Sequence, residues 1–285
     1  GYTPLNGHPY SFGCILNGFD KETKINQYPQ IESYLKKNLD YKNGIKGMKC
    51  SHVFCENKDR AEDIASTIKA KPISDISDFP EDLDLILILC DYSKERDSYI
   101  KELSKRYRLF VDKPLIRNET DYEVYLPLIK ENKIMSSSML VHDSQFKVFK
   151  STKELKEINV IYTGLWKNYA SHAIDPVLKI ISDQSHLQIS NNGENSIFLD
   201  NKNLLINFHK EKKNPPNFEY HFIYKNCEKF KVKIKSNFNS FRNGLISLRD
   251  IILSGDFYRE PNEYKSFLKI YEAIKHEWTL HIHWW

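Results

Sequence analysis

The sequence predicts an α/β fold in which a doubly wound parallel sheet is followed by an α+β domain with a mainly antiparallel, open sheet. Three observations lead to this prediction. In the first half, short apolar runs alternate with helical stretches, as in parallel sheets with crossover helices. One run, Leu85–Cys90, is uniformly apolar, as expected for a central strand covered on both faces. In the second half, strand-like segments follow one another through polar turns, which is typical of antiparallel sheets.

The first half supplies the elements of the parallel sheet. Apolar residues recur at helical spacing between the apolar runs, for example Ala61, Ile64, Ala65 and Ile68. We expect helices at Tyr10–Asn17, Gln30–Leu39, Arg60–Lys69, Ser93–Arg106 and Glu119–Glu131, and strands at His52–Cys55, Leu85–Cys90, Arg108–Val111 and Ile134–Leu140.

The second half changes from helices to strands. The expected strands are Ile158–Leu165, Ser196–Leu199, Leu204–His209, Phe218–Tyr224 and Phe230–Ile234. Two helices follow; Gly255 is placed to cap the first, and Pro261 to begin the second. At about 100–200 residues per domain, 285 residues suggest two domains. We place them at residues 1–143 and 144–285, and the usual first strand of the first domain is missing.

Composition narrows the class of protein. Apolar residues make up 40% of the chain, too many for a disordered protein. The 42 basic and 38 acidic residues are too evenly balanced to indicate binding to nucleic acid or to a membrane surface. Five cysteines without a CxxC pair argue against a disulfide framework and indicate a reducing compartment, which we expect to be the cytoplasm. Because Gly1 is not an initiator methionine, we expect the natural chain to begin earlier.

Two segments of the first half are candidates for binding a ligand. The loop around Gly7 and His8 enters a helix near Tyr10, and a helix N-terminus suits a phosphate group. The alternative is an ordinary turn before a helix, since the GxGxxG spacing is absent. Asp112-Lys113-Pro114 ends a predicted parallel strand, at the edge where open α/β sheets bind ligands. Lys113 could orient a cofactor or a substrate hydroxyl, or it could simply be a solvated residue.

Two segments of the second half contain histidines that could take part in chemistry. His172 and Asp175 follow a predicted strand, and a neutral imidazole can accept a proton from an alcohol. The alternatives are a structural role at a helix end for His172 and an N-cap role before Pro176 for Asp175. His281 and His283 resemble half of a metal site, but no carboxylate or cysteine cluster accompanies them, and an edge strand or packed tail explains them better.

Taken together, these segments resemble the Gfo/Idh/MocA family of NAD(P)-dependent sugar oxidoreductases. The similar features are an Asp-hydrophobic strand at Leu83–Ile88, a Lys-Pro motif with Asp112 in place of Glu, and a His-x-x-Asp motif at His172 and Asp175. Their order and separation match over most of the chain. The resemblance implies a Rossmann-like domain followed by a substrate domain whose open sheet often forms an oligomer interface.

The resemblance also implies a cofactor and a reaction. It implies NAD or NADP and hydride transfer to or from a sugar carbon, with Lys113 binding the reacting hydroxyl and His172 acting as the acid or base. Asn168 occupies the position where many members carry Asp. The segment Cys90-Asp91-Tyr92 replaces the residues usual after the central strand. Glu56 lies near the expected ribose-binding position, which weakly favours NAD.

Two functions therefore remain open. The first is an NAD(P)-dependent oxidoreductase acting on CH-OH groups of a sugar or sugar derivative, supported by Lys113 and His172. The second is a catalytically weak or inactive nucleotide- or sugar-binding protein, a sensor or scaffold, supported by Asn168 and the altered glycine loop. A solvated turn explains Lys210–Lys213 better than nucleic-acid binding does. We expect no membrane partner and no metal. We expect a homodimer or homotetramer formed through the second-domain sheet, because Phe218, Tyr220 and Phe222 share one face of a strand.

Overall fold

The computed structural model describes residues 6–148, 155–181, 187–192, 195–212, 217–256 and 259–275. Residues Gly1–Leu5, which open the loop considered for phosphate binding, lie outside this part of the chain, as do His281 and His283.

Contacts divide the chain into two compact units. Unit 1 comprises Gly1–Leu115, Leu128–His142 and Ser236–Tyr258, and unit 2 comprises Ile116–Pro127, Asp143–Lys235 and Arg259–Trp285. One crossing between the units lies between His142 and Asp143, and the expected division at residue 143 stays a prediction. The contact units have more than one crossing. The chain also passes from one unit to the other at both ends of Ile116–Pro127 and at both ends of Ser236–Tyr258. Sequence periodicity cannot show such returns, since it reports only local structure.

Unit 1 contains the expected alternation of helices and strands. Its helices are α1 (His8–Asn17), α2 (Pro29–Lys36), α3 (Lys58–Ile68), α4 (Lys94–Leu103) and α7 (Asn237–Ser254), and α5 (Glu119–Lys130) is divided between the units. Its strands are β1 (His52–Phe54), β2 (Lys71–Ile73), β3 (Ile86–Ile88), β4 (Leu109–Val111) and β5 (Ile134–Met135). Short 3-10 helices are η1 (Leu39–Tyr41), η2 (Ile76–Asp78) and η3 (Met139–His142). The strand expected at Ile134–Leu140 therefore ends early and is followed by η3.

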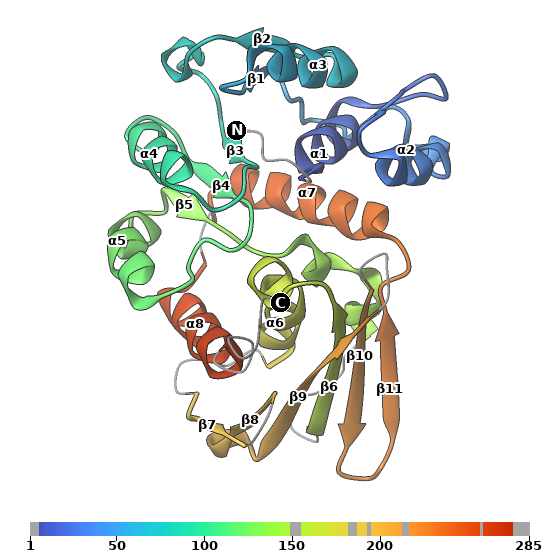
Figure 1. Ribbon diagram of the computed structural model, residues 1–285, viewed down its shortest axis with the longest axis vertical. Helices are drawn as coiled ribbons and strands as arrows, with labels where there is room; N and C mark the ends of the chain where they lie inside the picture. The colour runs from blue at the N-terminus through green and yellow to red at the C-terminus, as the bar shows by residue number, and fades with distance from the viewer. Residues whose placement is uncertain are drawn as a thin grey trace, which may run out of the picture. The chain divides into compact units, whose positions relative to one another are not determined.

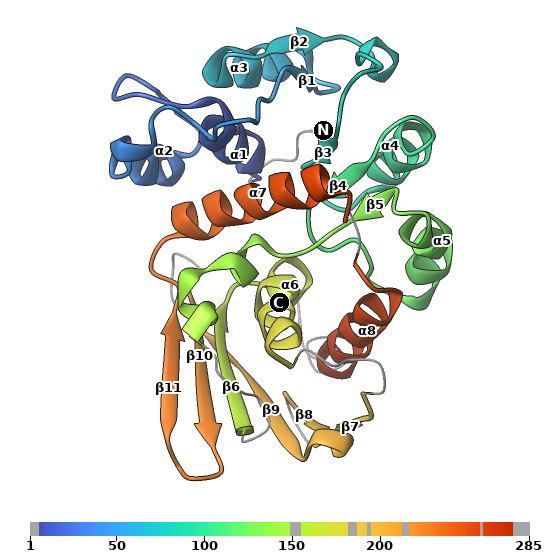
Figure 2. The same ribbon diagram turned by 180° about the vertical axis from the view of Figure 1, so that it is seen from behind.

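The parallel sheet of unit 1 is in two pieces. Strands β1 and β2 pair in parallel, and β3, β4 and β5 form a separate parallel sheet in the order β3-β4-β5. Both ribbon views show β1 and β2 apart from β3 (Figure 1, Figure 2). Among the described residues, β3 has a strand neighbour on one side alone, although its sequence predicts a central strand.

Local signals explain where the helices of unit 1 begin and end. Asn57 caps α3 by accepting a hydrogen bond from the Arg60 backbone N–H at 2.9 Å, and Ser93 caps α4 in the same way through Arg96 at 3.2 Å. Helix α7 ends at Gly255, whose φ of +81° gives the left-handed conformation that favours glycine. The cap expected at Gly255 is confirmed.

Unit 2 is built on a six-stranded sheet in the order β11-β10-β6-β9-β8-β7 (Figure 1). The strands are β6 (Leu155–Thr163), β7 (Ile189–Asn191), β8 (Ser196–Leu199), β9 (Leu204–Glu211), β10 (Phe218–Tyr224) and β11 (Lys229–Lys233), and its helices include α6 (Trp166–Ile181) and α8 (Pro261–Lys275). The short 3-10 helices η4 (Ser144–Val148) and η5 (Asp200–Lys202) also belong to it. Sequence analysis missed β7, a three-residue strand at the sheet edge.

The sheet of unit 2 is mixed rather than a simple meander. Four of its neighbour pairs are antiparallel, but β6 and β9 are parallel, with Ile158 opposite Ile206. A parallel pair needs a long connection, and here the chain between β6 and β9 includes α6 as well as two further strands. The fold class is confirmed: a parallel α/β part is followed by an α+β part with a mostly antiparallel sheet.

The aromatic face of β10 is buried inside unit 2. Phe218, Tyr220 and Phe222 are at most 4% exposed. The ring of Phe218 packs edge-on against His172 of α6 at 5.3 Å, and the Tyr220 hydroxyl donates to the His172 carbonyl. The expectation that these aromatics form an oligomer interface is therefore wrong, because α6 already covers them. A homodimer or homotetramer stays a prediction. Among the described residues, no helix is long and apolar enough to cross a bilayer.

Candidate functional site

The N-terminal loop of unit 1 meets the carboxyl ends of β3 and β4. The Asn6 side-chain amide donates to the Leu89 carbonyl at 3.1 Å and to the Asp91 carboxylate at 2.8 Å. The Asn6 side-chain oxygen accepts from the His8 backbone N–H at 3.0 Å, just where α1 begins. One side chain thus fixes the start of α1 beside the end of β3.

His8 connects the same loop to β4. Its Nδ1 lies 2.7 Å from an Asp112 carboxylate oxygen, and the Asp112 side chain is only 5% exposed. The imidazole stacks on Phe12 with ring centroids 5.1 Å apart, and Phe241 packs edge-on against it at 5.3 Å. These contacts fix the orientation of the imidazole. The buried Asp112 carboxylate therefore has the His8 ring as a polar partner where little water can reach it.

Lys113 follows Asp112 directly and stands at the same edge of the sheet. The Lys113–Pro114 peptide bond is cis, and the Pro114 carbonyl accepts from Arg96 Nη1 at 2.9 Å. Arg96 is fully buried in the first turn of α4, with its guanidinium 4.7 Å from the centroid of the Tyr92 ring. Arg96 therefore ties the turn after β4 to the turn after β3, and it positions the backbone that carries Lys113.

Gly7 and Tyr10 pack against other residues of unit 1. A Cβ on Gly7 would lie 2.3 Å from Ile31 Cδ1 and 3.0 Å from the Tyr28 ring, so glycine is needed here for packing against the α2 segment. Tyr10 is 1% exposed, and its hydroxyl donates to Asp63 of α3 and accepts from Arg60. Burial and the bond to Asp63 raise the pKa of Tyr10 above its usual range. Neither environment was expected from the sequence.

Glu56 stands just after β1. Its carboxylate accepts a hydrogen bond from the hydroxyl of Tyr99 on α4, whose ring also packs edge-on against Phe54 at 5.6 Å. Burial and the contact with Glu56 raise the pKa of Tyr99. Glu56 is exposed, as a residue that meets a polar ligand must be.

The remaining candidates of this edge lie between β3 and α4. Cys90 is 6% exposed, and burial raises the pKa of its thiol. Asp91 is bound by Asn6, and Tyr92 packs under Arg96. The structure therefore brings Asn6, His8, Asp91 and Asp112 together at one edge.

Three candidates of unit 2 share one helix. Asn168, His172 and Asp175 are spaced by four and three residues along α6, so they lie along one side of that helix. His172 is 6% exposed, whereas Asn168, in the first turn, is exposed. Because α6 begins at Trp166, His172 and Asp175 lie within the helix. The alternatives of a helix-end role for His172 and an N-cap role for Asp175 are therefore wrong.

Asp175 has a structural partner. Its side chain is 3% exposed and forms an ion pair with Arg259 at 3.2 Å, and Arg259 also contacts Glu263 of α8 at 3.0 Å. The guanidinium lies over the Tyr264 ring. A buried carboxylate needs such a partner, so this geometry supports a role for Asp175 in joining α6 to the start of α8.

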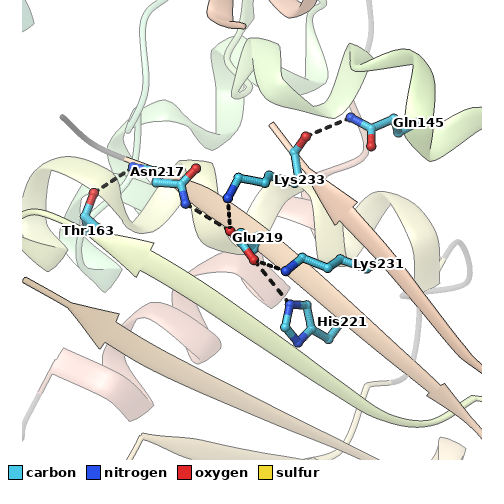
Figure 3. A network of polar contacts seen from close by, with 7 residues as sticks. All are labelled: Gln145, Thr163, Asn217, Glu219, His221, Lys231 and Lys233. Carbon is cyan, nitrogen blue, oxygen red and sulfur yellow. Dashed lines mark hydrogen bonds and ion pairs between the residues drawn. The ribbon is translucent and has the colours of Figure 1, made fainter. Parts of the chain in front are cut away.

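A second polar network covers the outer face of the unit 2 sheet (Figure 3). Glu219 on β10 accepts from Lys233 at 2.6 Å and contacts Lys231 at 2.5 Å and His221 at 3.4 Å. Asn217 donates to the same carboxylate at 3.2 Å. The hydrogen bonds from Lys231 and Lys233 hold the pKa of Glu219 well below its usual range. Sequence analysis did not select Glu219.

No metal cluster emerges from the described residues. They contain no group of three or more His, Cys, Asp or Glu side chains that could hold a metal ion. All five cysteines are free thiols. Burial raises the pKa of Cys14 to about 12 and that of Cys50 to about 11, so these thiols stay protonated at neutral pH.

Comparison with solved structures identifies the fold. A dehydrogenase (MviM) from Clostridium difficile matches with a TM-score of 0.61 at 18% identity, over 80% of this chain and 90% of that one. Myo-inositol 2-dehydrogenase from Lactobacillus plantarum matches with a TM-score of 0.61 at 12% identity, over 82% and 90%. KijD10, a 3-ketoreductase from Actinomadura kijaniata in complex with TDP-benzene and NADP, matches with a TM-score of 0.61 at 10% identity, over 80% and 88%.

The chain has the fold of these dehydrogenases. The two-part architecture implied by the resemblance to the Gfo/Idh/MocA family is therefore confirmed. No protein-family model matches the chain, and no curated protein sequence matches it significantly. At 10–18% identity these structures show the similarity of the fold alone.

Sequence reasoning found the edge of the site but missed several of its residues. Gly7, His8, Asp91 and Lys113 were selected because they follow predicted strands or begin a helix. Asn6 and Arg96 were not selected, since an isolated Asn or Arg carries no periodic signal. Asp112 was noted only as part of a motif; its position before Lys113, at the end of a buried strand, was a signal that could have identified it.

Proposed function

We propose that this protein is an NAD(P)-dependent oxidoreductase that transfers a hydride to or from a CH-OH carbon of a sugar or sugar derivative. The observation that carries the proposal is the polar cluster at the carboxyl edge of β3 and β4, formed by Asn6, His8, Asp91 and Asp112. Ligands of open α/β sheets bind at this edge. The dehydrogenase fold supports the same reaction class.

The residues at this edge fit a dinucleotide. The first turn of α1 contains no acidic side chain, and its helix dipole favours a phosphate, although the His8 N–H donates to Asn6 and Pro9 carries no N–H. Glu56, exposed after β1, suits the two hydroxyls of a ribose and weakly favours NAD. A bound nicotinamide would accept or donate the hydride. The neighbour that was crystallised with NADP supports the cofactor class but not the choice between NAD and NADP.

Proton transfer is assigned to two residues. Lys113, at the end of β4, is proposed to hold the substrate hydroxyl, and His172, on α6, is proposed to exchange its proton. Pro114 and Arg96 fix the backbone of Lys113. Packing against Phe218 fixes the His172 ring. Asn168, one helical turn before His172, would contact the same substrate without adding a negative charge.

The substrate class follows from polarity and from the neighbours. A polyol dehydrogenase and a ketoreductase bound to a TDP ligand share the fold, which supports a polyhydroxylated substrate. We also place the protein in a reducing compartment, the cytoplasm, which fits its five free thiols.

A second function is favoured by two observations. Asn168 replaces the carboxylate implied by the resemblance, and the side of Gly7 where a Cβ would stand is occupied by Tyr28 and Ile31. These features support a protein that binds a nucleotide or a sugar without turnover. The oxidoreductase is preferred because Lys113 and His172 are both present.

Binding and turnover measurements distinguish the two functions. Calorimetry with NAD and with NADP should show binding of at least one, and Glu56→Gln should weaken the binding of NAD more than Asp59→Asn, an exposed control in α3. On a verified sugar substrate, Lys113→Ala should lower turnover about 100- to 10,000-fold with little change in nucleotide affinity, and His172→Ala should remove a limb of the pH–rate profile. Lys130→Ala is the matched control. Nucleotide binding without turnover would favour the second function, and no binding would reject both.

A further inference from the structure

The two ring nitrogens of His8 have different surroundings. Nδ1 lies 2.7 Å from an Asp112 carboxylate oxygen. Within the described part of the chain, Nε2 forms no hydrogen bond, and it is not enclosed by the protein. The His8 side chain as a whole is 19% exposed. One nitrogen is therefore used inside unit 1, and the other can meet a ligand.

Asp112 determines which of the two nitrogens carries the proton. An ionised carboxylate can only accept hydrogen bonds, so Nδ1 must donate to it, and the Nε2 of a neutral imidazole then keeps a lone pair. The Asp112 side chain is 5% exposed, so water competes little for this bond. The geometry thus makes Nε2 of neutral His8 a hydrogen-bond acceptor.

Packing keeps the ring in this orientation. Phe12 stacks on the imidazole with its ring plane tilted by only 11°, and Phe241 contacts it edge-on at 5.3 Å. A ring turned over would place a carbon where Nδ1 stands and would lose the bond to Asp112. Nε2 therefore has a fixed direction before any ligand arrives, which lowers the entropic cost of binding one.

An acceptor at this position selects the chemistry of its ligand. A phosphate oxygen carries only lone pairs and would face the lone pair of Nε2, whereas a hydroxyl can donate its proton to it. Peptide donors for a phosphate are also few here, because the His8 N–H donates to Asn6 at 3.0 Å and Pro9 has no N–H. The group that fits Nε2 of His8 is therefore a hydroxyl.

We propose that Nε2 of His8 accepts a hydrogen bond from a sugar hydroxyl, and that Asp112 is the positioning residue that fixes the tautomer and direction of the ring. The proposal rests on the proposed function, which supplies two sources of such a hydroxyl: the ribose of the dinucleotide and the polyhydroxylated substrate. Asp112 follows β4 and directly precedes Lys113. The end of one strand thus holds both a hydroxyl acceptor, through His8, and the ammonium donor of Lys113.

Two substitutions separate the roles of the two nitrogens. His8→Asn keeps a donor near the position of Nδ1 and removes the acceptor at Nε2. His8→Gln keeps an acceptor near the position of Nε2 and loses the bond to Asp112. We expect His8→Asn to weaken binding of the hydroxyl ligand about tenfold, the effect of one lost hydrogen bond, and to weaken it more than His8→Gln does.

A purely structural role predicts the reverse order of the two variants, because only the bond to Asp112 would then matter. Hydrogen exchange of the β4 amides reports this structural part separately, and His8→Asn should leave it close to that of the natural protein. His52→Asn is the matched control: His52 lies on β1 of the same unit, its Nδ1 contacts Ser51 at 2.9 Å, and its replacement should not alter binding.

Calorimetry with three kinds of probe identifies the source of the hydroxyl. NAD tests the ribose, D-glucose and sorbitol added to the NAD complex test the substrate, and inorganic pyrophosphate tests a phosphate. Weaker binding of NAD by His8→Asn would identify the ribose, and weaker binding of a polyol alone would identify the substrate. If His8→Asn weakens neither, or weakens pyrophosphate as much as NAD, the proposal is overturned.

Nitrogen NMR of histidine-labelled protein gives a readout that needs no ligand. The His8 signals are those missing from His8→Asn, and their shifts should place the proton on Nδ1; Asp112→Asn should move part of it to Nε2. A proton on Nε2 in the natural protein would overturn the proposal whatever the probes show. Protein that binds neither NAD nor NADP loses the proposed function and this proposal with it, whereas NAD binding by a protein with the Nε2 proton rejects this proposal alone.

Discussion

The two sheets differ in where they carry their polar groups. In unit 1 the strands β3, β4 and β5 are apolar, and polar residues stand beyond the carboxyl ends of β3 and β4, as with Asp91 and Asp112. In unit 2 the polar residues lie along the strands, where Asn207 donates to Glu157 at 3.0 Å and to Asn159 at 2.9 Å, and Glu219 binds two lysines. Polar groups at strand ends can bind a ligand. Polar side chains along the face of a sheet instead form hydrogen bonds and ion pairs with one another.

The sheets also differ in how completely they are paired. Strand β6 has neighbours on both sides, β10 and β9, and Ile158 at its centre is fully buried. The sequence of β3 is more uniformly apolar than that of β6, yet within the described residues β3 is paired on one side alone and its Leu87 is half-buried. The apolar character of a strand therefore does not by itself show how many neighbours the strand has in its sheet.

The largest expected effect tests the difference in pairing. Ile158→Ala should lower the free energy of unfolding by about 2–5 kcal/mol, because it leaves a cavity in a closed core. Leu87→Ala, which removes a half-buried side chain, should cost about 1 kcal/mol. Site-resolved hydrogen exchange measures each unit separately, which matters because a chain with two units need not unfold in one step. Equal losses would remove the distinction between the two strands.

The next effect tests the polar groups at the strand ends. Asp112→Asn should destabilise unit 1 by about 2 kcal/mol, because His8 loses a charged partner at a nearly dry site. Asp91→Asn is the matched control: Asp91 is exposed, and the amide oxygen of Asn can still accept from Asn6. Exchange rates of the β4 amides report the change. If both variants behave alike, the contact between His8 and Asp112 does not order this edge.

A smaller effect concerns pH and unit 2. Because the folded-state pKa of Glu219 is lowered, its contribution to stability is complete above the ordinary glutamate pKa of about 4.3 and is lost as the pH falls toward the folded value. Unit 2 should therefore become less stable on acidification. Glu219→Gln should make this loss shallower and cost about 1 kcal/mol at neutral pH, as the lysines are half exposed. Urea unfolding of both proteins between pH 3 and pH 7, roughly the range around that pKa, measures it.

The smallest effect tests whether the Glu219 network is redundant. Lys231→Ala and Lys233→Ala should each cost only a few tenths of a kcal/mol, about the value of an exposed ion pair. The double variant should cost more than the sum, since either lysine alone still neutralises the carboxylate. Strict additivity in thermal melts would show that the two lysines act independently.

The sequence alone predicted most elements of this protein. Apolar runs and helical spacing located α3, α4, β3 and β4 to within a few residues, since burial imposes a period of 2 or 3.6 on any strand or helix. The cap at Gly255 was also predicted, because a helix end depends on the few residues beside it. The resemblance to the Gfo/Idh/MocA family implied the dehydrogenase fold, and the predicted strand before Asp112 placed Lys113 at the carboxyl edge of the sheet.

Only the tertiary structure decided which distant residues meet. Asn6 and Asp91, or His8 and Asp112, are separated by more than eighty residues, and no local period records such contacts. The same holds for the parallel pairing of β6 with β9 and for α6, which begins early enough to bury His172 and Asp175 within it. These features depend on packing between whole elements, because a contact across the fold is selected by the shape and charge of both partners and not by the residues beside either one.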